Sequence, residues 1–225
     1  MQVGGALLVV DEGIRTLSPS AVILVGIAFG LDETLSMGDI LVSQQLLGYE
    51  MQKVATSHEG KVEIVPRGDR PRASTRLLDR FLGGMLDWHG SKVECGLILS
   101  GDKLVDHKNF RDQLRKLAPE AVGGEMEGTG LYSAAQRRKV DWILVKAISD
   151  WADGKKGDDK DQCQQTAAEN AVRFTLHVLR QGVLSRIFQA IPPLRQEQMS
   201  AAPRFRPRVE RSCVNMMCMQ AGSSP

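Results

Sequence analysis

The stretch that decides the fold runs from Ala121 to Asp150 and reads AVGGEMEGTGLYSAAQRRKVDWILVKAISD. Residues 121–126 are mostly apolar or glycine and predict a short buried strand. Residues 128–138 have the spacing of a helix, and residues 140–148 form a second apolar run typical of a strand. The order strand, helix, strand is the unit from which largely parallel sheets are built.

The same alternation continues outward on both sides of this stretch. We expect helices over residues 6–17, 74–86 and 108–117 and from 161 onward, and strands over 21–25, 40–47, 62–65 and 93–99. Strands alternating with helices predict an α/β sandwich with a mixed, mostly parallel central sheet.

Length and composition limit the domain count and the kind of partner. The chain has 225 residues, of which 42% are hydrophobic and 25% charged, so one α/β domain over residues 1–188 is expected. Residues 189–225 combine prolines with arginines and are predicted to form a disordered basic tail. The net charge is +2, and six arginines against two glutamates from Arg186 onward leave the body mildly acidic. Nucleic-acid binding by the folded body is therefore not expected.

Other classes of protein are disfavoured by what the sequence lacks. No apolar run approaches the roughly 20 residues of a membrane span, and no secretory signal is recognisable. The four cysteines form no CxxC pair, so neither a zinc site nor a disulfide framework is predicted. These observations favour a cytoplasmic protein that does not bind membranes.

Two carboxylates follow the two strands of the deciding stretch. Ligands of open α/β sheets bind beyond the carboxyl ends of the strands, so Glu127 and Asp150 are expected to face one crevice as a catalytic pair. The alternative is that Glu127 is only an acid in the first turn of a helix, where the helix dipole favours a negative charge, and that Asp150 only caps a loop. A basic run can hold phosphates or be merely solvated, and its arginines are Arg67, Arg70 and Arg72.

Three segments carry a family resemblance. They are VGIAFGL at 25–31 with GDILVS at 38–43, LSGDKLV at 99–105, and GEMEG at 124–128 with KAISD at 146–150. In order and separation they resemble the nucleoside phosphorylase/nucleosidase family, which includes purine nucleoside phosphorylases and methylthioadenosine/S-adenosylhomocysteine nucleosidases. The resemblance implies a three-layer α/β/α sandwich and cleavage of the bond between ribose C1′ and a purine nitrogen. It implies no metal and no organic cofactor.

The resemblance also implies roles for individual residues. Glu127 would accept hydrogen bonds from ribose hydroxyls, and Met126 would pack on the ribose. Asp150 would act as the general acid at N7 of the purine, with Ser149 orienting it, and Lys146 stands where the nucleosidases carry an arginine near the attacking water. The further residues expected along the base, ribose and nucleophile are Leu104, Val105, Gly26, Ile27, Ala28 and Glu125.

These roles agree with the chemistry of the reaction. The departing purine takes the bonding electrons, and a proton on N7 removes that charge. A carboxyl group is ordinarily ionised at neutral pH, so Asp150 must be desolvated or hydrogen-bonded in its neutral form. The sugar becomes oxocarbenium-like, and the negative charge of Glu127 would stabilise it.

Two departures from the family pattern leave alternatives open. The family has a strand before the segment that resembles residues 1–6, so the sheet is expected to lack its N-terminal strand and to leave a neighbouring strand unpaired. Ile27 stands where the nucleosidases have a serine that holds water. We favour water as the nucleophile and a purine nucleoside or nucleotide as the substrate. The alternatives are a phosphate-dependent phosphorylase and a catalytically impaired purine-binding or oligomerisation module. A homo-oligomer is expected from the family.

Overall fold

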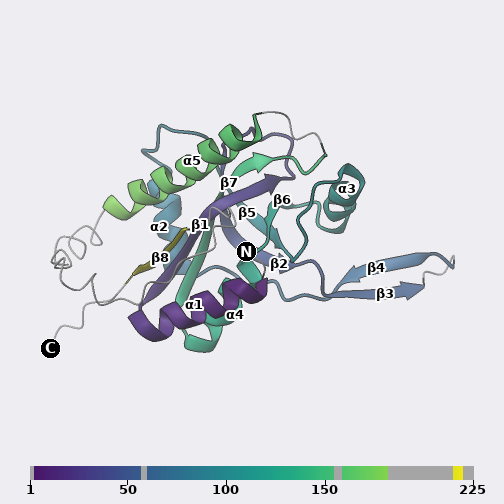
Figure 1. The fold of residues 1–225 in the computed structure, drawn as a ribbon, viewed down its shortest axis with the longest axis horizontal. Helices are drawn as coiled ribbons and strands as arrows, with labels where there is room; N and C mark the ends of the chain where they lie inside the picture. The colour runs from purple at the N-terminus through teal and green to yellow at the C-terminus, as the bar shows by residue number, and fades with distance from the viewer. Residues whose placement is uncertain (1–2, 57–59, 155–158, 182–214, 220–225) are drawn as a thin grey trace.

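The structure is a computed structural model that describes residues 3–56, 60–154, 159–181 and 215–219 (Figure 1). The helices are α1 (Val3–Leu17), α2 (Thr75–Gly84), α3 (Lys108–Leu117), α4 (Gly128–Arg138) and α5 (Lys160–Arg180). The strands are β1 (Ala21–Gly30), β2 (Ile40–Gly48), β3 (Gln52–Thr56), β4 (Val62–Pro66), β5 (Val93–Ser100), β6 (Ala121–Glu125), β7 (Asp141–Asp150) and β8 (Asn215–Met219).

Five strands of the main sheet close into a barrel. Their order is β6, β5, β2, β7 and β1, and β1 pairs again with β6. The pairs β1–β7, β2–β5 and β5–β6 are parallel, whereas β2–β7 and β1–β6 are antiparallel. Closure covers the edge of β1 at Phe29 and Gly30 only, and leaves the edge of residues 21–28 to other partners.

Two glycines of β6 make the closure sterically possible. Phe29 and Gly30 of β1 pair with Gly124 and Gly123 of β6. A Cβ atom at Gly123 would lie 2.7 Å from the carbonyl oxygen of Phe29, and one at Gly124 would overlap the Phe29 ring. Side chains at these two positions would therefore keep β1 and β6 apart.

The α/β class with a mixed sheet is confirmed, but the arrangement of the sheet differs from the expectation. An open sheet between two helical layers does not describe strands that close on themselves. The expected lack of an N-terminal strand stays a prediction. Residues 21–25 of β1 pair with β8, a strand far from them in the sequence.

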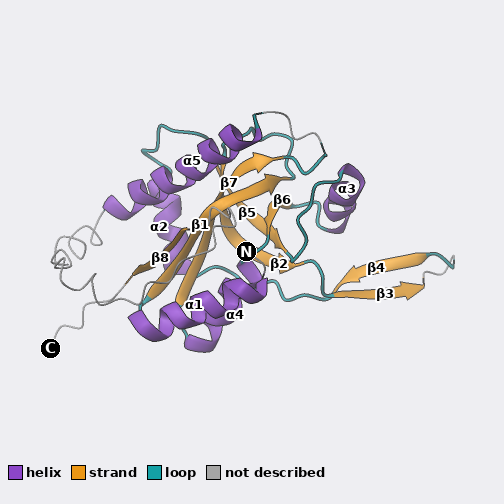
Figure 2. Ribbon diagram, in the orientation of Figure 1, coloured by secondary structure: helices purple, strands orange, loops and turns teal. Residues whose placement is uncertain are grey.

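Helices pack on two sides of the closed sheet. Figure 2 shows α1 and α4 together on one side, and α5 with α2 on another. Helix α1 buries Ala6, Val10 and Ile14 toward this core. The guanidinium of Arg138 at the end of α4 bonds Asp11 of α1 with an N–O distance of 2.9 Å. The main core is lined by apolar residues of β1, β2, β7 and α5.

Most predicted elements are confirmed, and two strands were missed. Strand β3 pairs with β4 in a hairpin that projects from the body (Figure 2). Its residues are mostly exposed, so the apolar pattern that marks buried strands is weak there. Strand β8 lies in the predicted disordered tail, and the rest of residues 189–225 lies outside the described residues. Among the described helices, none has the length and apolar character required to cross a membrane.

Candidate active site

Lys146 lies inside the protein between two glutamates. Its Nζ donates a hydrogen bond to Oε2 of Glu127 over 2.9 Å and lies 3.4 Å from Oε2 of Glu125. All three side chains are almost completely removed from solvent. Strand β7 supplies the lysine, and the end of β6 with the residue before α4 supplies the two acids. A buried charge is stable only when paired, so this cluster must be assembled as a unit.

The pKa values in the cluster move in the directions that keep Glu127 and Lys146 charged. Burial opposes ionisation of Glu127, but the positive charge of Lys146 and its hydrogen bond contribute to a pKa below the ordinary value. Burial also opposes the charge of Lys146, whereas Glu125 and Glu127 together raise its pKa above the ordinary value. Burial raises the pKa of Glu125. Glu127 therefore remains a carboxylate at neutral pH.

Glu125 anchors the start of helix α4. Its carboxylate accepts hydrogen bonds from the backbone N–H groups of Glu127 and Gly128, both at 2.9 Å. The first N–H groups of a helix have no partner within the helix, and a carboxylate there also complements the helix dipole. A Cβ atom at position 128 would lie 2.7 Å from Oε1 of Glu125, so glycine is required beside this acid. Glu125 thus fixes the backbone on which Glu127 sits.

Asp150 ends β7 and is hydrogen-bonded through Ser149. The Oγ of Ser149 lies 3.1 Å from Oδ2 of Asp150 and 3.3 Å from the carbonyl oxygen of Ala28. The N–H of Ala152 donates to Oδ1 of Asp150 over 2.9 Å. In the pairing of β1 with β7, Ala28 is opposite Ile148 and Phe29 is opposite Asp150, so Ser149 forms a bulge. A bulge redirects side chains, and this one turns Ser149 toward both partners.

The strand pairing brings Asp150 and Glu127 to one region of the barrel. Phe29 pairs with Asp150 on one side and with Gly124 on the other. Asp150 and Gly124 are thus separated by two strand spacings, about 10 Å. Glu127 follows Gly124 by three residues, and Lys146 precedes Asp150 by four residues in β7, with the bulge at Ser149 between them.

Residues 26–28 of β1 lie between these groups. Gly26 pairs with Lys146 and Ala28 with Ile148 along β7. On the opposite edge of β1, the pairing with β8 stops at Val25 and the pairing with β6 begins at Phe29. Within the described residues, no strand pairs with residues 26–28 on that edge. Backbone groups of residues 26–28 that face this edge have no partner strand among the described residues, and buried backbone groups need a partner such as a ligand or water.

The remaining residues predicted to line the site differ in how deeply they are buried. Val105 is buried in a cluster that includes Phe29 and Ala152, whereas Leu104 is 75% exposed and forms no wall. Met126, which stands between Glu125 and Glu127 in the sequence, is half-buried. Ile27 is half-buried and packs against the main core.

Of the basic run, Arg70 lies away from the carboxylate cluster. Arg70 pairs with Glu120 at 2.5 Å, and Glu120 immediately precedes β6, at the opposite end of this strand from Glu127. Arg72 forms an isolated bridge with Gln45 in the middle of β2. Arg67 is exposed. The charge of Arg70 is already balanced by a neighbouring acid at some distance from the expected crevice.

Two polar residues near the cluster were not predicted. Ser100 at the end of β5 pairs with Glu125, and its Oγ accepts the N–H of Thr129 over 3.0 Å. Ser100 thus holds a second N–H group of the α4 N-terminus. The hydroxyl of Tyr49, which is buried, has no hydrogen-bond partner among the described residues. A polar residue directly after an apolar strand is the signal that could have indicated Ser100.

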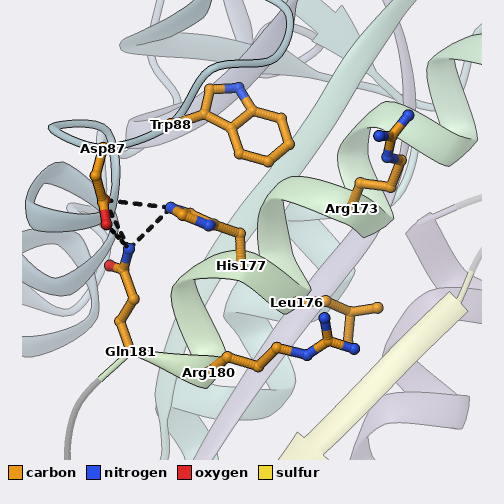
Figure 3. A pocket seen from close by; sticks show the side chains of 7 residues that line it. All are labelled: Asp87, Trp88, Arg173, Leu176, His177, Arg180 and Gln181. Atoms are coloured by element: carbon orange, nitrogen blue, oxygen red, sulfur yellow. Dashed lines mark hydrogen bonds and ion pairs between the residues drawn. The ribbon is translucent and has the colours of Figure 1, made fainter.

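A large hollow lies elsewhere on the molecule. It has a volume of about 610 Å³ and lies between the loop after α2 and the end of α5 (Figure 3). Within it, the Asp87 carboxylate accepts a hydrogen bond from Nε2 of Gln181 over 2.6 Å and lies 3.3 Å from Nε2 of His177. None of the predicted site residues lines this hollow. The candidate site is not this hollow. It is the region where the buried cluster of Glu125, Glu127 and Lys146 adjoins the unpaired edge of residues 26–28.

Comparison with known proteins identifies the family. The sequence profile of the phosphorylase superfamily matches residues 5–180. The chain belongs to this superfamily. The matched range contains the whole Glu125–Glu127–Lys146 cluster and Asp150. The family resemblance inferred from the sequence motifs is therefore confirmed.

Relatives within the phosphorylase superfamily include named nucleosidases. The 5′-methylthioadenosine/S-adenosylhomocysteine nucleosidase of Staphylococcus epidermidis is 33% identical over 143 residues, which cover 63% of this chain and 61% of the relative. A death domain-containing ATP nucleosidase of Amphimedon queenslandica is 29% identical over 191 residues, covering 76% of this chain and 36% of the relative. The chain thus spans roughly a third to three-fifths of the length of these two relatives.

A solved structure in the phosphorylase superfamily has the same fold. The 5′-methylthioadenosine/S-adenosylhomocysteine nucleosidase of Neisseria meningitidis, in complex with methylthio-immucillin-A, matches with a TM-score of 0.68 and 25% identity. The match covers 80% of this chain and 78% of that protein. The futalosine hydrolase of Helicobacter pylori matches with a TM-score of 0.67 at 23% identity, which is a likeness of fold.

Proposed function

We propose that this protein hydrolyses the N-glycosidic bond of a purine nucleoside. The observation that carries the proposal is the buried Glu127 carboxylate, paired with Lys146, in the same region of the barrel as Asp150. The nucleosidase relatives described above support the same reaction class. Cleavage requires one acid that gives a proton and one carboxylate that stays negative, and we propose Asp150 for the first role and Glu127 for the second.

Asp150 is proposed to protonate N7 of the departing purine. Its Ser149 contact serves both protonation states. When Asp150 is ionised, Ser149 donates to Oδ2; when Asp150 carries a proton, it can donate to Ser149 Oγ while Ser149 donates to the carbonyl of Ala28. The hydroxyl of Ser149 therefore reverses its role without any movement of the backbone. Such a chain can bond Asp150 in either protonation state.

Glu127 is proposed to bind the ribose hydroxyls and to stabilise the positive charge that develops on the sugar. It keeps its negative charge because Lys146 balances it within a region from which water is excluded. An interior carboxylate acts on a developing cation more strongly than one in water, because the local dielectric constant is low. Met126, between the two glutamates in sequence, is proposed to pack on the ribose.

Water is the nucleophile that this site favours. Residues 26–28 offer no hydroxyl group and no charged side chain for a phosphate ion. The ammonium of Lys146 is bonded to Glu127 and lies against Glu125, so it is not free to hold an anion. Arg70 is paired with Glu120 at the far end of β6. A nucleoside is therefore a better substrate for this geometry than a nucleotide.

The test is release of free base from defined substrates. Purified protein is incubated with adenosine, methylthioadenosine or ATP, with and without phosphate, and the products are separated by chromatography. We expect free adenine from a nucleoside without phosphate. Release only in the presence of phosphate would make the protein a phosphorylase. Binding without release from any substrate would make it a purine-binding module and would refute the proposal.

A further inference from the structure

Strand β1 divides its outer edge between two neighbours. Residues 21–25 pair antiparallel with β8, and Phe29 and Gly30 pair with β6. The register places Asn215, the first residue of β8, opposite Val25. The pairing with β8 therefore stops one residue before Gly26, where the gap in the candidate site begins. The lower boundary of this gap is set by the chain segment 215–219.

Among the described residues, strand β8 pairs with β1 alone. It is the last strand in the order of the sheet, and its main contacts are with β1 and α1. Each of the five strands of the barrel has two neighbours within the described residues. An edge strand of five residues with a single partner opens more readily than the strands it covers. Its partner, β1, is a central apolar strand. If β8 left, the uncovered edge of β1 could pair with another strand.

We propose that the β1 edge over residues 21–25 is a strand-acceptor surface, that the chain's own residues 215–219 are its detachable occupant, and that occupancy of this edge controls the candidate site. Main-chain hydrogen bonds supply the affinity, as in other cases of strand addition to a sheet edge. When β8 leaves, the unpaired stretch of β1 extends from residues 26–28 back to Ala21. Residues 26–28 are then held by their pairing with β7 alone, while the stretch of β1 before them has lost one of its two neighbours. The control of activity rests on the proposed function, whereas the strand exchange does not.

The register can be tested in the full-length protein with a cysteine pair. Val22 is opposite the native Cys218, and directly opposed residues of antiparallel strands have Cα atoms about 4.5–5.5 Å apart, within the range for a disulfide. We expect the thiol introduced by Val22→Cys to form a disulfide with Cys218 on mild oxidation, identified by mass spectrometry. Ile23→Cys is the matched control, because Ile23 is opposite Met217 and adjacent residues point to opposite faces. Absence of the disulfide in Val22→Cys, or equal yields in both variants, would overturn the proposed register.

Detachment is tested with two truncated chains. One ends at Val214 and lacks β8, and the control ends at Met219 and retains it. Hydrogen exchange of those amides of residues 21–25 that face β8 should accelerate at least tenfold only in the chain that ends at Val214, and base release by this chain should fall at least tenfold. A peptide of residues 213–220 added in trans should restore both, whereas a scrambled peptide should restore neither.

The two readouts separate this inference from the proposed function. Unchanged exchange in the chain that ends at Val214, or failure of the peptide to restore slow exchange, would overturn the strand-acceptor surface. Slow exchange restored without any effect on base release would overturn the control of the site. If the chain that ends at Val214 loses the whole fold, the oxidised Val22→Cys protein decides: its exchange at residues 21–25 should be at least tenfold slower than in the reduced form.

Discussion

Lys146 donates a hydrogen bond to Glu127 over 2.9 Å in a part of the protein from which solvent is almost entirely excluded. One strand, β7, thus carries both the cation that holds Glu127 ionised and, four residues later, the proposed acid Asp150. The structure and the proposed chemistry are linked through this strand, and changes along it should separate catalysis from stability.

Asp150→Asn should abolish most base release without preventing binding. An amide cannot supply the proton that N7 requires, so kcat should fall by about 100–10,000-fold. Affinity for adenine should change much less, because the lost interaction belongs to the transition state. Asp141→Asn is the control, since Asp141 begins the same strand and bonds Arg76 at 2.6 Å, far from the cluster. A rate for Asp150→Asn equal to that of the control would exclude Asp150 as the acid.

Lys146→Met should destabilise the fold severely. Removing the ammonium leaves two buried glutamates without their cation, and breaking a buried pair in this way costs about 3–5 kcal/mol. Lys146→Arg keeps the charge and should cost less. Urea unfolding monitored by circular dichroism measures both variants. Equal stability of Lys146→Met and wild type would show that the glutamates do not depend on Lys146 for their charge balance.

The raised pKa of Lys146 predicts a specific loss of stability in alkali. Glu125 and Glu127 outweigh burial and raise this pKa above its ordinary value of 10.5, so the contribution of Lys146 is complete below that pH. As pH rises further, the unfolded chain releases the proton before the folded protein does, and the free energy of unfolding falls by up to about 1.4 kcal/mol per pH unit. Lys146→Arg should lack this component. Urea titrations from about pH 10 upward should show the steeper decline in wild type, and parallel curves would contradict the assignment.

Gly128→Ala, at the first residue of α4, should displace Glu125 of the buried cluster. The new methyl group would lie 2.7 Å from Oε1 of Glu125 and 3.1 Å from Cδ1 of Leu46, which should cost about 1–3 kcal/mol. Gly4→Ala is the matched change in α1, where a Cβ atom meets nothing within 4 Å, and it should stabilise the protein by roughly 0.5–1 kcal/mol. Thermal unfolding should therefore shift in opposite directions for the two variants. A shift in the same direction would remove the steric reason for glycine at position 128.

Local patterns predicted many of the elements. Unbroken apolar runs marked β1, β2, β5 and β7, because strands buried on both faces need apolar side chains throughout. The apolar periodicity of residues 6–17 marked α1. Two acids after two such strands also pointed to the region that contains Glu127 and Asp150. These inferences depend only on residues close in sequence.

Long-range pairings were beyond such patterns. The pairing of Phe29 with Gly124, which closes the barrel, joins residues far apart in the chain. Neither local sequence pattern indicates which segment will be its partner. Arg70, one of the arginines considered for phosphate binding, forms an ion pair with Glu120, which is 50 residues away in the sequence. Strand β8 lies in a segment whose composition suggested disorder, and only the free edge of β1 gives it a partner.

The amino-acid sequence by itself determined the α/β class, the family and the residues that carry the proposed chemistry, because these follow from local periodicity and from short motifs. The tertiary structure alone decided that Lys146 joins Glu125 and Glu127 in one buried cluster, that Ser149 lies between Asp150 and Ala28, and that β8 covers β1. Each of these depends on which distant segments share an edge or an interior. Burial and hydrogen bonding of the entire chain, rather than any local preference, select that arrangement.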